Sequence, residues 1–321
     1  MDMNAWRISP PLGMCGQPRS LRSCGKTIFG STDNKEVESF RGRVGAAIFE
    51  RVAGPQGRDR RRQVHQAAGE RWFAEDRPVR RVHGDSSMFI GGIRALLLQS
   101  LHPLAMAAVA EPSDYRGDPW GRLQRTSYCL AVTTFGRADD ARAAIARVRA
   151  VHERVTGTAP DGRPYAASDP HLLTWVHIAE ADSFLRAHSR FGTRPLDQAG
   201  RDGYVADMAR IGRELGVPDP PRTEAELADR ITSYRAELAA TAQAREAARF
   251  LLVNPPLPAV ARAPYGVLAA ASVSLLPGWA RQPLRLPRLP VTETVLVRPA
   301  GHAMVRAIRW ATSAPPSAKA S

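Results

Sequence analysis

The chain has little cysteine and none of the motifs that mark the commonest catalytic sites. Its three cysteines, Cys15, Cys24 and Cys129, form no CxxC pair, which excludes a disulfide framework and a cysteine-based zinc site. The motifs GxxxxGK[ST], GxGxxG after a strand, HExxH and GxSxG are also absent. Their absence argues against P-loop, Rossmann, zincin and α/β-hydrolase chemistry. What remains is the chemistry of histidine and arginine.

Acidic residues are few relative to basic ones. The chain has 45 Lys and Arg against 31 Asp and Glu, a net charge of +14 that comes mostly from arginine. Such an excess favours anionic partners, such as membrane headgroups or ligand carboxylates and phosphates, although an arginine-rich coding bias would give the same excess. Only residues 58–62 form a basic cluster, and no aromatic platform accompanies it. Nucleic-acid binding is therefore not expected.

Alternation with period two is absent, and the apolar residues follow helical spacing, which predicts an all-α fold. Residues 1–40 are rich in Gly, Ser and Pro and predict a disordered leader. We expect a single helical domain over residues 41–310 and a flexible tail over 311–321. The first residues contain no apolar segment typical of a secretory signal, which predicts a cytoplasmic protein.

Residues 88–110 are apolar nearly all round and are long enough to be a transmembrane candidate. Arg94, His102 and Pro103 within this run favour instead a helix buried in the protein and kinked near Pro103. The pattern predicts a loop over residues 156–168. It predicts further helices over residues 119–135, from 139 through His152, 169–190, 202–215 and, as one long helix, 223–252.

His152 lies on the apolar stripe of its predicted helix. Ile145, Val148 and Val155 recur at helical spacing, and His152 falls on the same stripe. An imidazole that points into a core needs a hydrogen-bond partner or a metal ion, so a structural role and a metal-binding role are both open. Arg149 lies one turn earlier, where it can pair with an anionic group beside the ring.

Arg122 and Thr126 form an i,i+4 pair on the helix predicted over residues 119–135. Two arginine-bearing helices and one inward histidine suggest a pocket for an anionic, metal-containing cofactor such as haem.

Three other histidines lie on or beside apolar helices. His177 has Glu180 one turn later, which can orient the ring if His177 binds a metal, and a buried His–Glu hydrogen bond is the structural alternative. His102 precedes Pro103, and a structural hydrogen bond is its expected role. His171 follows Asp169-Pro170 at a helix start, where we expect it to be exposed.

The runs GGIRALLLQSLHPLAMAAVA (91–110), EPSDYRGDPWGRLQRT (111–126), VRAVHERVTG (148–157) and SDPHLLTWVH (168–177) resemble the rubber oxygenase/MpaB-like oxygenase family. The resemblance covers about residues 84–290. Bacterial latex-clearing proteins of this family have a globin-like helical core that holds haem b, and they cleave isoprenoid C=C bonds with dioxygen. The fungal MpaB branch is membrane-bound and cleaves a farnesyl-derived chain. The resemblance therefore implies a globin-like core with additional helices, and haem b as the cofactor.

The family's motifs can be carried over residue by residue. Its R-x-x-x-T motif matches Arg122 and Thr126, and its R-x-x-H motif, which contains the proximal iron ligand, matches Arg149 and His152. The resemblance thus implies that His152 binds iron and that Arg149 and Arg122 contact the cofactor. It gives Arg122 and Thr126 catalytic roles as well.

Other positions are less well matched. The nearest candidates for the family's catalytic carboxylate are Glu111 and Asp114, in the turn before Arg122. Arg125 replaces a lysine that caps the haem in some latex-clearing proteins, and arginine cannot ligate iron in that way. Thr156 replaces an arginine four residues after the proximal histidine. The missing secretion signal argues against polymeric rubber as the substrate.

The sequence therefore predicts a haem-dependent oxygenase that acts on a hydrophobic, isoprenoid- or lipid-like molecule with dioxygen. His152 is the predicted iron ligand and His177 the alternative. The apolar run over residues 265–279 predicts either a substrate entrance or a peripheral contact with an anionic membrane, and a broken pair of core helices is its structural alternative. The alternative function is a non-catalytic helical protein that binds an apolar ligand at such a membrane, with His152 making only a structural hydrogen bond.

Overall fold

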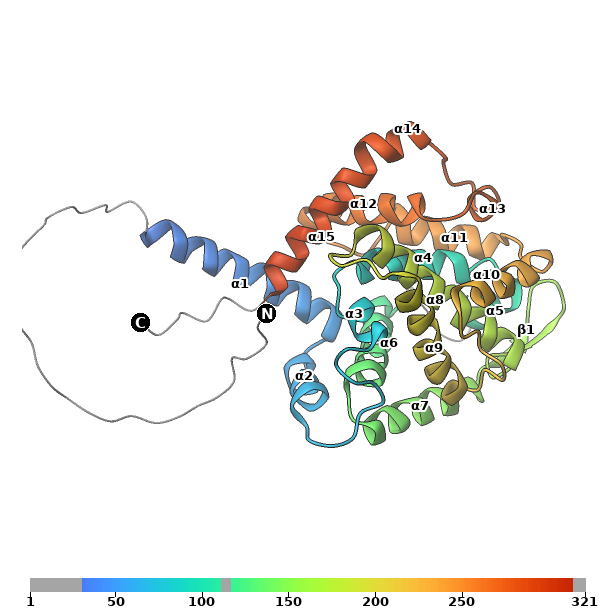
Figure 1. The fold of residues 1–321 in the computed structure, drawn as a ribbon. Helices are drawn as coiled ribbons and strands as arrows, with labels where there is room; N and C mark the ends of the chain where they lie inside the picture. The colour runs from blue at the N-terminus through green and yellow to red at the C-terminus, as the bar shows by residue number, and fades with distance from the viewer. Residues whose placement is uncertain (1–30, 111–116, 314–321) are drawn as a thin grey trace, which may run out of the picture. The chain divides into compact units, whose positions relative to one another are not determined.

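The computed structural model describes residues 31–110 and 117–313 (Figure 1), and it confirms the all-α fold class. One short hairpin is the exception among the described residues. The elements in chain order are α1 (Ser31–Ala53), α2 (Gly57–Gln66), α3 (Pro78–His83), α4 (Met88–Gln99), α5 (Pro103–Ala110), α6 (Pro119–Phe135), α7 (Ala138–His152), β1 (Thr156–Thr158), β2 (Pro164–Ala166), α8 (Pro170–Phe191), α9 (Gln198–Leu215), α10 (Glu224–Ser233), η1 (Tyr234–Ala236), α11 (Ala242–Leu252), α12 (Ala259–Ser274), α13 (Gly278–Arg281), α14 (Pro290–Thr292), η2 (Glu293–Val297) and α15 (Arg298–Thr312).

Residues 1–39 and 40–321 form two units, and the packing described below is that of the second. The predicted leader, residues 1–40, lies outside the described residues up to position 30. From Ser31 on, its last part is helical and opens α1. The last helix, α15, ends at Thr312, close to the predicted domain end at residue 310. Most of the predicted tail lies outside the described residues.

Helix starts read from the sequence are confirmed by their caps. The carboxylate of Asp118 accepts a hydrogen bond from the backbone N–H of Gly121 at the start of α6. Asp169 does the same for His171 at the start of α8, and Pro occupies the first position of both helices. Thr223 accepts from the backbone N–H of Glu226 at the start of α10. These caps fix where the helices that carry the candidate site begin.

The helix predicted over residues 202–215 begins earlier, at Gln198, where the Asp197 side chain caps it. Two other predictions of local structure were wrong. Residues 156–168 contain an antiparallel hairpin, in which Gly157 pairs with Tyr165. Strands of three residues are too short to show a period of two. The helix predicted over 223–252 is interrupted between Ser233 and Ala242, and the Thr241 side chain caps the start of α11 by accepting from the backbone N–H of Ala244. A local cap here overrides the continuous helical spacing.

The central helix of the core is α8; α4 packs along it, and α12 packs against α4. Trp175, Ile178 and Leu185 of α8 are fully buried with Leu97 of α4. Gly91 permits this close packing, because a Cβ atom there would lie 2.7 Å from Cδ1 of Phe184. The core is thus built on the apolar run and the helix that follows Asp169.

The apolar run 88–110 forms two helices, α4 and α5, which meet at a bend of 108°. Pro103 opens α5, which confirms the predicted break. Among the described residues no single helix is long and apolar enough to cross a membrane, and this bent pair meets the criterion only by length and composition.

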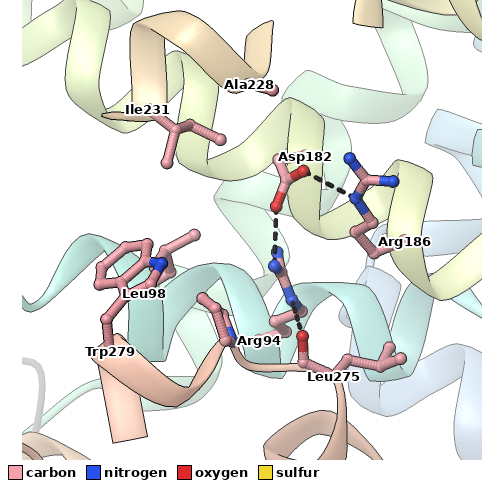
Figure 2. Close-up of a pocket in the computed structure, with 9 residues that line it drawn as sticks. Arg94, Leu98, Asp182, Arg186, Ala228, Ile231, Leu275 and Trp279 are labelled. Carbon is pink, nitrogen blue, oxygen red and sulfur yellow. Dashed lines mark hydrogen bonds and ion pairs between the residues drawn. The ribbon is translucent and has the colours of Figure 1, made fainter. Parts of the chain in front are cut away.

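Arg94 is buried in α4 and fully paired, as Figure 2 shows. Its guanidinium lies 2.7 Å from the Asp182 carboxylate of α8 and donates to the carbonyl oxygen of Leu275 over 3.1 Å. Asp182 also accepts from Arg186. These groups form one wall of a pocket of about 270 Å³, whose apolar walls include Leu98, Ile231 and Trp279. Arg186 also lies 2.8 Å from a second carboxylate, that of Glu224, so each charged side chain of this pocket has a charged partner.

Candidate functional site

His152 is the last residue of α7 and is half-buried. Its Nδ1 atom is buried, and none of the described residues makes a hydrogen bond to it. Burial lowers the pKa of His152, and the charge of Arg122 lowers it further. A neutral imidazole with a free nitrogen is the form that binds metals. The ring therefore lacks, on this nitrogen, the hydrogen bond that a purely structural histidine would make.

Arg122 approaches His152 from α6, which packs against α7. Burial lowers the pKa of Arg122, and the charge of Arg125 lowers it further. A desolvated guanidinium favours an anionic partner. The structure thus brings together Arg122 and His152, two of the residues that the sequence singled out.

The companions of these two residues are more exposed. Thr126 lies one turn after Arg122 on α6 and is exposed, and Arg149 lies one turn before His152 on α7 and is also exposed. The Arg125 guanidinium forms a surface ion pair with Asp118 at 3.1 Å. Glu111 and Asp114, the candidate catalytic carboxylates, lie outside the described residues.

His177 and Glu180 lie on α8. Burial lowers the pKa of His177 to about 4 and raises the pKa of Glu180 to about 7. The hydrogen bonds of the described residues include none between these two side chains, so the structure does not provide the pairing that the sequence suggested. Instead the His177 ring packs on Gly212 of α9, where a Cβ atom would lie 2.9 Å from Nε2.

Glu180 faces a group of polar side chains that the sequence reasoning missed. Burial, followed by the charge of Glu180, raises the pKa of the Cys129 thiol to about 11. Burial also raises the pKa of Tyr204, again followed by the charge of Glu180. The Tyr204 hydroxyl and Nε2 of His83 are buried, and no described residue makes a hydrogen bond to either. In the sequence, the only feature that could have indicated these residues is that each is a polar residue on an otherwise apolar helix face.

These residues come from helices that pack together. His83 ends α3, Cys129 lies on α6, Glu180 on α8 and Tyr204 on α9, and α3 contacts the other three. The rings of His83 and Tyr204 meet edge to face with centroids 5.9 Å apart. His83 also shares a hydrogen bond of 2.8 Å between its Nδ1 and the Thr134 hydroxyl. The junction of α3, α6, α8 and α9 is therefore polar at its centre.

Comparison with known proteins gives one match. The family model described as "ER-bound oxygenase mpaB/B'/Rubber oxygenase, catalytic domain" matches residues 80–310, which include α6, α7, α8 and α9 and the residues named above. No curated protein and no solved structure matches the chain. Since the match covers most of the chain, the protein belongs to the MpaB/rubber oxygenase family, whose shared domain is an oxygenase catalytic domain.

Proposed function

We propose that the protein is a haem-dependent oxygenase in which His152 binds the iron and a hydrophobic small molecule is oxidised with dioxygen. The observation that carries the proposal is the buried Nδ1 atom of His152, which no described residue satisfies, next to the desolvated Arg122. An orphaned imidazole nitrogen suits the iron, and a partly buried guanidinium suits a propionate. The family match supports oxygenase chemistry in the domain that contains these two residues.

When bound, the haem would supply the binding and activation of dioxygen. The protein's own residues would hold it and control protons around it. His152 stays neutral because burial and the charge of Arg122 oppose its protonation. Arg149 provides a second cation, in addition to Arg122, one turn before His152. Thr126 adds a hydroxyl on the same helix as Arg122, and we propose Glu111 or Asp114 as the carboxylate that accepts a proton from the substrate.

The polar junction near Glu180 also suits a ligand-binding interior. His83, Cys129 and Glu180 each keep part of their surface accessible, although burial is the first cause of the shift in each pKa. Polar side chains of this kind suit contact with a bound ligand, and in this proposal haem or substrate would lie against them.

The visible spectrum of the full chain, purified from haem-supplemented cells, tests the iron ligand. We expect a Soret band that is lost in His152→Ala and kept in His302→Ala, an exposed histidine on α15. Loss of the band in His177→Ala together with its retention in His152→Ala would identify His177 as the ligand instead. A protein that stays colourless after haem reconstitution would contradict the proposal.

Dioxygen consumption with an isoprenoid substrate tests the reaction. Glu111→Gln and Asp114→Asn are expected to keep the Soret band, and one of them should lower the rate by about 10²-fold or more. If both variants keep the wild-type rate, neither residue is the catalytic carboxylate.

We also propose a peripheral contact with an anionic membrane. Most of the run 265–279, which the sequence suggested for this contact, is buried or partly buried. The region between α13 and α15 instead exposes Val291, Val295 and Leu296, and the exposed arginines Arg285 and Arg288 precede them. Apolar side chains flanked by cations suit an anionic lipid surface. Co-sedimentation with vesicles that contain anionic lipid should fall in Val295→Asp/Leu296→Asp. Equal sedimentation of this variant and the wild type would contradict the contact.

A further inference from the structure

A second group of potential ligands lies away from Arg122 and His152. His102, His171 and Glu237 each offer one ligand atom, and the three atoms lie within 4.8 Å of one another. His102 follows α4 at the bend, His171 is the second residue of α8, and Glu237 follows η1. The three residues are far apart in the sequence, so only the tertiary fold brings them together.

Backbone and side-chain hydrogen bonds fix the three segments to one another. The backbone N–H of Ala239 donates to the carbonyl oxygen of Leu101 over 2.8 Å, which ties the Glu237 segment to the residue before His102. The indole N–H of Trp175 on α8 donates to the carbonyl oxygen of Gln99 over 3.1 Å. The positions of the three ligands therefore do not depend on a bound ion.

Tyr234 determines which nitrogen of His171 carries a proton. Its hydroxyl donates its hydrogen to the backbone carbonyl oxygen of His171 over 2.9 Å. The hydroxyl oxygen of Tyr234 is therefore left to accept from Nδ1–H of the His171 ring at 3.2 Å. A neutral His171 then has its lone pair on Nε2. That nitrogen lies 2.8 Å from Oε2 of Glu237, and two acceptors at this distance need a cation between them.

A proton on Nε2 of His171 would satisfy Glu237 but would leave Nε2 of His102 without a partner among the described residues. The His102 side chain is 2% exposed, and none of the described residues makes a hydrogen bond to its Nε2 atom. This atom lies 3.6 Å from the same oxygen of Glu237, too far for a hydrogen bond. The backbone N–H of Ala105 lies 3.5 Å from Nδ1 of His102, at the long limit for a hydrogen bond, so it opposes a proton on Nδ1 only weakly.

We propose that His102, His171 and Glu237 form a mononuclear site for a divalent first-row transition metal ion. One ion would satisfy all three ligand atoms at once, and two imidazoles with one carboxylate are a donor set that such ions favour. At metal–ligand distances of about 2.0–2.2 Å, tetrahedral ligands lie about 3.4 Å apart, between the 2.8 Å and 3.6 Å separations from Glu237. His171 and Glu237 are half-exposed, so water can occupy a further coordination position.

The charges around the cluster allow a cation to bind. Arg163 is the arginine whose charge acts on His102, and its guanidinium forms an ion pair with Asp161 at 2.7 Å. The Glu237 carboxylate is the anionic ligand of the site. The site is also independent of the proposed haem site, since it shares no residue with it.

Zinc and cobalt titrations of the chelator-treated full chain test the proposal. We expect one ion per chain by calorimetry with Zn²⁺, and visible d–d bands with Co²⁺. His171→Ala and Glu237→Gln should each weaken binding by at least about tenfold, whereas His302→Ala should bind as the wild type does. Because His171 and Glu237 are half-exposed, these two variants are expected to fold even if a substitution at the buried His102 does not.

Two further variants make the test specific. Tyr234→Phe keeps the ring that stacks on His171 and removes only the hydroxyl, so it should weaken binding about tenfold and shift the Co²⁺ bands. His152→Ala should lose the Soret band and keep the zinc site, and His171→Ala should do the reverse, so the two proposals fail separately. Equal Zn²⁺ affinity in the wild type and in His171→Ala/Glu237→Gln would overturn the site.

Discussion

The charge of Arg122, on α6, lowers the pKa of His152 at the end of α7, beyond the lowering that burial causes. Arg149 precedes His152 by one turn on the same helix, yet it is exposed and is not among the charges that shift this pKa. The cation that acts on His152 therefore comes across the helix pair α6 and α7.

Arg122→Gln should raise the pKa of His152 toward its ordinary value of 6.5, because it removes the cation that opposes protonation. Titration of the His152 ring by NMR in the haem-free protein measures this change. Arg149→Gln is the matched control and should leave the pKa where it is. An equal change of the His152 pKa in both variants would contradict the prediction, because it would mean that Arg149 on α7 affects this pKa as much as Arg122 on α6 does.

Glu180 should make the protein less stable as the pH rises. Burial raises its pKa from 4.5 to about 7, so the folded state binds a proton that the unfolded state releases between these values. The free energy of unfolding should fall by about 1.4 kcal/mol per pH unit over this range, on the order of 3 kcal/mol in all.

Urea unfolding at pH 5 and pH 8 measures this loss. Glu180→Gln cannot ionise, so the difference between variant and wild type isolates the contribution of Glu180 from those of other groups. The variant should be more stable than the wild type at pH 8 and of similar stability at pH 5. The same pH dependence in both proteins would contradict the assignment.

Gly212→Ala should destabilise the fold by about 1–3 kcal/mol, because its Cβ atom would lie 2.9 Å from Nε2 of the buried His177 ring. Gly266→Ala on α12 is the control, since no atom lies within 4 Å of its Cβ position. It should be neutral or stabilising by about 0.5–1 kcal/mol. Melting temperatures separate the two outcomes, and equal temperatures would mean that the His177 ring moves aside without cost.

Arg94→Met should cost about 3–5 kcal/mol, because it leaves part of the buried Asp182 carboxylate without its partner. Arg125→Met removes an arginine from the exposed pair with Asp118 and should cost less than about 1 kcal/mol. Denaturant midpoints compare the two. Similar losses would imply that Arg186 alone compensates the charge of Asp182.

Much of the helical architecture could be predicted from the sequence, because its determinants are local. Asp118-Pro119 and Asp169-Pro170 place the starts of α6 and α8 through a side-chain cap and a fixed proline φ. Pro103 marks the break between α4 and α5. The prediction of one helix over residues 223–252 was wrong because α10 ends at Ser233. The apolar spacing in the sequence continues through this break and gives no sign of it.

The same break explains why the cluster of His102, His171 and Glu237 could not be predicted from the sequence. Glu237 follows η1 in the interrupted stretch and meets His102 and His171 only there. In a continuous helix Glu237 would be one more exposed carboxylate. His171 was expected to be exposed, and its side chain is 49% exposed. The hydrogen bond between His171 and Glu237 joins residues that are 66 positions apart in the sequence, so it forms only in the folded chain.

By itself, the sequence determined the all-α class, the main helix starts and the bend at Pro103, because caps, prolines and apolar periodicity act over a few residues. The tertiary structure alone decided which charge reaches His152, since Arg122 lies on another helix and Arg149 turns outward. It also decided which polar groups are buried without partners, because burial and hydrogen bonding depend on contacts between elements far apart in the chain.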